Sequence, residues 1–75
     1  MIKLTREDAA RLLALAVDEE AIVSGCAWLR LDKTELKASP HWESGDYDTG
    51  CVFVFRSDLA DLAAAPEGAA LEFLP

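Results

Sequence analysis

The spacing of apolar residues changes at Gly25, and this change constrains the fold more than any other feature of the sequence. Upstream of it, apolar residues recur every three or four positions, as on one face of an amphipathic helix. Downstream, from Cys26 to Asp32, side chains alternate as in a half-buried strand. A chain of 75 residues that carries both patterns is predicted to be one compact α+β domain spanning residues 1–75.

The first half is predicted to contain two helices. Thr5 and Asp8 form a variant of the capping box, so a helix is expected from about residue 6 to residue 17. The acidic run Asp18-Glu19-Glu20 would be unfavourable at the end of a helix. We therefore expect it to begin a second short helix that runs through Val23 and ends at Ser24-Gly25.

Strands are predicted at residues 2–4, 26–32, 33–38, 51–55 and 69–74. In the strand 26–32, Ala27, Leu29 and Leu31 share one face and Trp28 shares the other with Arg30. We expect Trp28 to be a core residue rather than an interface residue. These elements predict a small, mostly antiparallel sheet of three to four strands, with two or three helices packed on one face.

The segment 51–55 is apolar on both faces. It is predicted to be a central strand covered on each side, unless one face is an interaction surface. A short helix over 59–65 is expected next, capped by Ser57 or Asp58. Before the strand, residues 39–50 are rich in turn formers and are predicted to be one long loop.

Charge is distributed unevenly along the chain. The formal net charge is −7, which disfavours direct binding to nucleic acid or to an anionic membrane. Residues 1–37 hold six basic and seven acidic residues, whereas residues 38–75 hold one basic residue, Arg56, and seven acidic ones. The second half is therefore predicted to present a strongly negative surface.

No catalytic, cofactor or metal site is predicted, and we expect the protein not to be an enzyme. Cys26 and Cys51 lack the spacing of a zinc site and are expected to be reduced, partly buried thiols. His41 is the only histidine and has no orienting partner nearby in the sequence. The segment 46–50 begins like a calcium loop, but Gly50 occupies the fifth position, where a ligand is required.

Residues 1–5 lead directly into the charged run Arg6-Glu7-Asp8, so no apolar segment of a secretion signal is expected there, and no apolar run approaches the length of a membrane span. A cytoplasmic location without membrane contact is therefore expected. Trp42 and Tyr47 lie in the long loop among carboxylates, where they would suit a binding patch with an aromatic anchor.

The compact acidic domain, the lack of catalytic motifs and the late cluster of acidic residues resemble the small phage- and prophage-encoded anti-CRISPR proteins, especially acidic DNA mimics directed at type I systems. The acidic residues that carry the resemblance are Glu43, Asp46, Asp48, Asp58 and Asp61. The resemblance implies an inhibitor that binds the basic DNA- and PAM-recognition surface of a CRISPR surveillance complex in an infected bacterial host. These carboxylates, with Trp42 and Tyr47, would bind the partner and block target DNA.

An alternative hypothesis is a small acidic adaptor, antitoxin or immunity-type module. Such a module would use a sheet edge or the face that carries Phe53 and Phe55 for a hydrophobic interface. From the sequence we expect a monomer rather than a homodimer.

Overall fold

The computed structural model describes residues 2–39 and 51–73. In chain order the elements are β1 (Ile2–Thr5), α1 (Arg6–Leu13), β2 (Glu20–Val23), β3 (Cys26–Arg30), β4 (Glu35–Ser39), β5 (Val52–Phe55), α2 (Arg56–Ala63) and β6 (Ala70–Phe73). The α+β class predicted from the sequence is therefore confirmed, with two helices in the described part of the chain.

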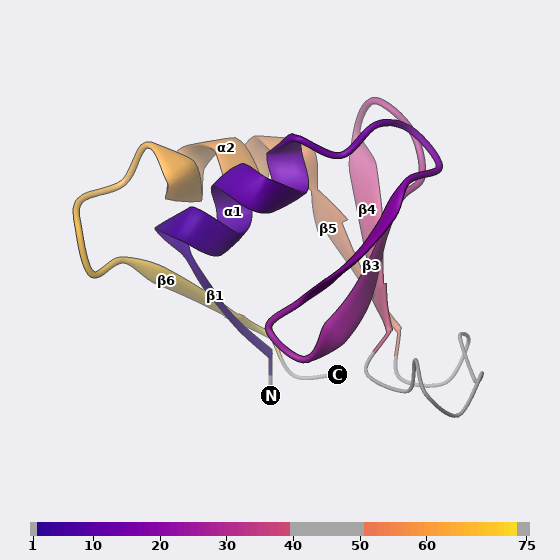
Figure 1. Ribbon diagram of the computed structural model, residues 1–75. Helices are drawn as coiled ribbons and strands as arrows, with labels where there is room; N and C mark the ends of the chain where they lie inside the picture. Colours follow the sequence, from indigo (N-terminus) through magenta and orange to yellow (C-terminus); the bar gives the residue numbers. More distant parts are fainter. Residues whose placement is uncertain (1, 40–50, 74–75) are drawn as a thin grey trace.

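The described strands form two antiparallel sheets rather than one. A four-stranded sheet has the order β2-β3-β4-β5, and β1 pairs with β6 in a separate two-stranded sheet. Helices α1 and α2 pack on each other and on the same side of the four-stranded sheet (Figure 1). The core between these layers is built around Trp28, Leu12, Leu36 and Leu59, which are completely buried.

Helix α1 begins where the sequence predicts it. The Thr5 hydroxyl accepts the Asp8 N–H at 3.2 Å, and the Asp8 carboxylate accepts the Thr5 N–H at 3.0 Å, which completes the capping box. The helix ends at Leu13, earlier than the predicted residue 17. It stops because the chain turns toward the sheet, where the Asp18 N–H donates to the Arg30 carbonyl at 2.7 Å.

The second predicted helix, over residues 18–23, is wrong: Glu20–Val23 form strand β2. Ser24 and Gly25 have φ of 55° and 76°, which is the backbone of a two-residue hairpin turn with both central residues in the left-handed region. The Ser-Gly pair therefore joins β2 to β3, with Val23 opposite Cys26, instead of ending a helix. The acidic run Asp18-Glu19-Glu20 therefore leads into strand β2, of which Glu20 is the first residue.

Trp28 is a core residue, as predicted, and it lies on the face of its strand that packs against the helices. Its side chain is fully buried, and its indole Nε1–H donates to the Val23 carbonyl at 3.0 Å. Leu29, on the opposite side of the sheet, is half-buried, and so is Leu31. One indole fills the space under the helices better than the smaller aliphatic side chains.

Strand β4 forms as predicted, but β5 is an edge strand rather than a central one. Helix α2 starts at Arg56, directly after Phe55, and has no side-chain cap, so the predicted caps Ser57 and Asp58 lie inside its first turn. The last predicted strand is confirmed as β6.

Candidate protein-binding surface

The side of the four-stranded sheet opposite the helices is called the outer face, and strand register determines which residues lie on it. It is formed by Glu20 and Ile22 of β2, Ala27 and Leu29 of β3, Glu35, Lys37 and Ser39 of β4, and Phe53 and Phe55 of β5. Ile22 and Phe53 are each 59% exposed and Phe55 is 54% exposed. Three large apolar side chains thus face away from the core.

The alternation within β5 explains why both phenylalanines lie on this face. Successive side chains of a strand point to opposite sides, so Val52 and Val54 point toward the helices and Phe53 and Phe55 point away. Val54 is 3% exposed and belongs to the core. The order Val-Phe-Val-Phe therefore places the smaller side chains inside and the larger ones outside.

Exposure is unequal across the outer face. Near the end of β4, Ala27 and Ser39 are buried. The half-buried side chains Leu29, Glu35 and Lys37 lie between the two edge strands. The most exposed apolar groups are consequently at β5 and at Ile22 of β2.

Two of the predicted partner-binding residues lie on α2. Asp58 and Asp61 are three positions apart on this helix, and both are exposed. The other five predicted residues lie outside the described residues: Trp42, Glu43, Asp46, Tyr47 and Asp48. Ser39 and Cys51, which flank that segment, are at one end of β4 and β5, whereas α2 begins at the other end of β5 (Figure 1).

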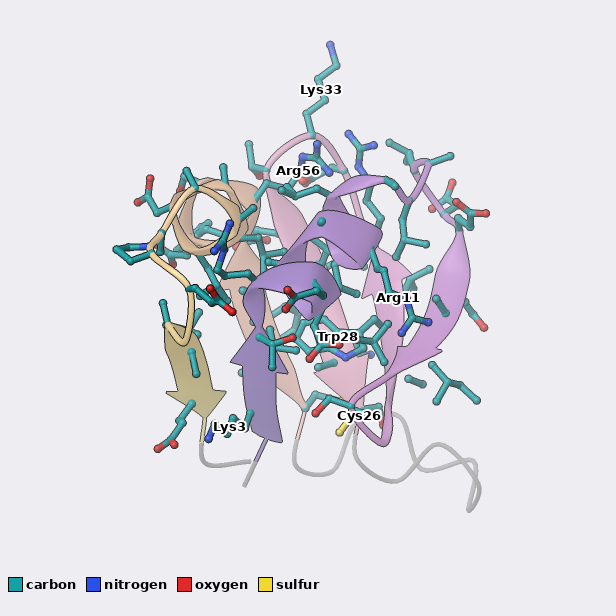
Figure 2. The ribbon with its side chains drawn as sticks, turned by 60° about the vertical axis from the view of Figure 1, so that its left-hand side comes forward. Lys3, Arg11, Cys26, Trp28, Lys33 and Arg56 are labelled. Atoms are coloured by element: carbon teal, nitrogen blue, oxygen red, sulfur yellow. The ribbon has the colours of Figure 1, made fainter. Side chains whose placement is uncertain are left out.

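Two arginines bind the C-terminal end of α1. Arg56 donates from Nη1 to the Leu13 carbonyl at 3.3 Å, and Arg30 donates from Nη1 to the Leu15 carbonyl at 2.7 Å. Carbonyl groups at a helix end carry partial negative charge, which a guanidinium stabilises. Figure 2 shows Arg56 at this end of the helical layer. The guanidinium of Arg56 is therefore hydrogen-bonded to the backbone at the end of α1.

Asp58 and Asp61 place two carboxyl side chains on the exposed surface of α2. Within residues 2–39 and 51–73, neither forms an ion pair or a side-chain hydrogen bond with another residue. Arg56, the one basic residue of the second half, is held by α1 as described above. Helix α2 therefore carries two carboxylates and one guanidinium, because the hydrogen bond of Arg56 to a neutral carbonyl leaves its charge in place.

Cys26 is buried and Cys51 is half-buried, and no disulfide joins them. Burial raises the pKa of the Cys26 thiol, so it stays protonated and weakly nucleophilic at neutral pH. Within residues 2–39 and 51–73, no three His, Cys, Asp or Glu side chains are grouped as metal ligands would be. His41 lies outside the described residues.

Sequence reasoning identified Phe53 and Phe55 as a candidate surface but missed Ile22. The sequence pattern predicts a helix at Ile22, and a helix gives no indication that this side chain is exposed on the outer face. The available signal was the pair of β-branched residues Ile22 and Val23 directly before Ser-Gly, a combination typical of a strand entering a tight hairpin turn.

Comparison of this chain with protein-family models, with curated proteins and with solved structures found no match. Helices α1 and α2 have eight residues each, and among the described residues no helix has the length and apolar character to cross a membrane. The chemistry of the surfaces must therefore carry any functional interpretation.

Proposed function

We propose that this chain is a non-enzymatic protein-binding module whose partner docks on the outer face of the four-stranded sheet. The observation that carries the proposal is the exposure of Phe53, Phe55 and Ile22 on one side of a sheet whose other side is closed by helices. Exposed apolar groups gathered on one face are typical of interaction sites, and aromatic side chains contribute strongly to such interfaces.

The fold does not require these aromatic side chains where they are. The core is already filled by Trp28 and by the aliphatic residues around it, and neither phenylalanine belongs to it. Complete burial of a fully exposed phenylalanine is worth about 1.5–3 kcal/mol, and Phe53 and Phe55, which are 59% and 54% exposed, would each contribute roughly half of this in a complex. Two adjacent phenylalanines on an edge strand therefore favour docking of a partner with an apolar surface.

A photo-crosslinking amino acid at Phe53 tests this proposal in living cells. We expect a covalent adduct of defined mass from position 53, and none from Ala60, a matched exposed position on α2. The adduct should disappear when Phe55 is also changed to Ser. Absence of any adduct at position 53, or equal adducts at both positions, would overturn the proposal.

A second candidate function is inhibition of a basic nucleic-acid-binding protein by acidic mimicry, as in the anti-CRISPR proteins that the sequence resembles. It is supported by the unpaired carboxylates of Asp58 and Asp61 and by the engagement of Arg56 with α1. In this mechanism the carboxylates occupy a cationic DNA-binding cleft of a type I surveillance complex and keep DNA out. Long-range attraction would accelerate the encounter.

Charge reversal on α2 tests the second candidate. The Asp58→Lys, Asp61→Lys variant should bind a purified type I surveillance complex at least tenfold more weakly at low salt. The matched control Glu7→Lys, Glu67→Lys makes the same charge change at exposed positions away from these two residues and should bind nearly as well as the unmodified chain. Binding that is insensitive both to salt and to the α2 reversal would exclude mimicry.

A further inference from the structure

We infer that the partner of the outer face is a second copy of this chain, packed face to face about a two-fold axis; this inference rests on the proposed function of that face. It starts from the register of β3, β4 and β5. Leu29, Lys37 and Phe53 lie side by side across these strands and are called the lysine row.

A second row lies next to the first, two residues further along each strand. It consists of Leu31, Glu35 and Phe55 and is called the glutamate row. Glu35 is opposite Phe55, and the Leu31 N–H donates to the Glu35 carbonyl at 3.1 Å, which continues the β3–β4 ladder. Each row thus contains a leucine, a charged residue and a phenylalanine, in the same order.

This arrangement is self-complementary. Consider a two-fold axis that runs across the strands, between the two sheets and midway between the rows. It places the lysine row of one copy over the glutamate row of the other, so that Phe53 meets Phe55 and Lys37 meets Glu35. Every contact occurs twice, as an isologous interface requires. Apolar groups meet apolar groups, and opposite charges meet.

The charges also select this register over the neighbouring ones. An axis that passes through a row itself would place Lys37 over Lys37, or Glu35 over Glu35. Like charges in direct opposition at an interface cost several kcal/mol. Pairing along the edges of β5 is a poorer solution, because the exposed rings of Phe53 and Phe55 project from the face and would stay in water.

The size of the face predicts a weak dimer. Its four strands, spaced by about 4.8 Å, and the lysine and glutamate rows, spaced by about 6.6 Å, span roughly 14 Å by 7 Å. Two faces of this size bury less than the roughly 1,600 Å² of a standard interface, and a dissociation constant in the micromolar range is expected. Because the helices cover the other side of the sheet, Asp58 and Asp61 of both copies would remain accessible on the outside of the dimer.

The test is sedimentation equilibrium of the full chain from about 1 µM to 1 mM, a range that brackets a micromolar dissociation constant. We expect a monomer–dimer equilibrium that the Phe53→Ser, Phe55→Ser variant shifts at least tenfold toward monomer, with an unchanged circular dichroism spectrum. A dimer that persists in this variant would contradict the face-to-face arrangement. A wild-type chain that stays monomeric at 1 mM would overturn the second copy as partner, whereas an adduct with another protein at position 53 would still support the proposed function.

Charge variants test the register of the interface. Lys37→Glu and Glu35→Lys should each weaken self-association, and mixing the two variants should restore it, because one copy then offers two carboxylates and the other two ammonium groups. The double variant that exchanges the two residues should dimerise like the wild type. Glu7→Lys, an exposed change on α1, is the control and should have no effect. Failure of the mixture to associate better than either variant alone would reject this pairing of rows.

Discussion

Both faces of the four-stranded sheet carry large apolar side chains, but the inner face is covered by helices and the outer face also carries charged residues. On the inner face, Trp28, Leu36 and Val54 are buried beneath α1 and α2. On the outer face, Phe53 and Phe55 are more than half exposed. The comparison teaches that hydrophobicity alone does not decide which side of a short strand is buried. The strand period and the placement of the helices decide it.

The largest predicted effect is on the inner face. Trp28→Ala removes a completely buried indole and should cost about 3–5 kcal/mol, which approaches the total stability of a domain this small. We expect the variant to be largely unfolded in buffer, as measured by circular dichroism and urea titration. Phe53→Ala, studied where the chain is monomeric, should change the free energy of unfolding by less than about 0.5 kcal/mol. If both variants lost the same free energy of unfolding, the inner and outer faces would not differ in their contribution to stability.

A smaller effect is expected at the edge of the inner face, where Arg30 joins the sheet to the end of α1. Arg30→Leu leaves the Leu15 carbonyl without this charged donor and should cost about 2 kcal/mol in urea unfolding. Arg11→Leu is the matched control, since Arg11 is exposed and has no hydrogen-bond partner for its guanidinium. If both variants lose the same stability, the bond to Leu15 does not help to hold the helical layer on the sheet.

The β2–β3 turn sets the register that separates the faces. Gly25→Ala should cost about 1 kcal/mol, because φ of 76° is unfavourable for a residue with a Cβ atom. No atom lies within 4 Å of the added methyl group, so the cost is purely conformational. Gly25→Asn should lose less, since asparagine tolerates this region. Thermal unfolding of both variants measures the difference, and an equal loss would contradict a backbone origin.

The smallest effect concerns the turn between β3 and β4, which holds the same register. Backbone N–H groups of Thr34 and Glu35 and the Thr34 hydroxyl donate to the Asp32 carboxylate and lower its pKa. A carboxylate whose pKa is lower in the folded state than in the unfolded state stabilises the fold above its unfolded-state pKa of about 3.9. This stabilisation is lost as the pH falls through the folded-state pKa. Urea unfolding at pH 6 and at pH 2 measures this effect. Between these two pH values the free energy of unfolding should decrease slightly more for the wild type than for Asp32→Asn. The opposite order would contradict this role.

Local signals predicted part of the fold correctly. The Thr5–Asp8 capping box placed the start of α1, and the alternation after Gly25 placed β3. Local signals failed for β2, because an acidic run before a Ser-Gly pair fits either a helix or a hairpin. The buried face of β3 and the edge position of β5 depend on strand order and on helix placement, which are long-range properties.

The surfaces were predictable to different degrees. Exposure of Asp58 and Asp61 follows from their charge and helical spacing. The apolar character of both sides of residues 51–55 indicated either a covered strand or an exposed face, and only the sheet order distinguishes the two. Self-complementarity of the outer face could not be inferred from the sequence, because it depends on the pairing register of three strands.

The pairing of β1 with β6 constrains the order of events during synthesis. Ile2 is opposite Phe73, so this small sheet joins two segments from distant parts of the sequence. The β2–β3–β4 meander pairs neighbouring segments and needs only the first 39 residues. During synthesis, β2, β3 and β4 can therefore pair as soon as they have left the ribosomal exit tunnel. Strand β1 can pair only after β6 has also left the tunnel.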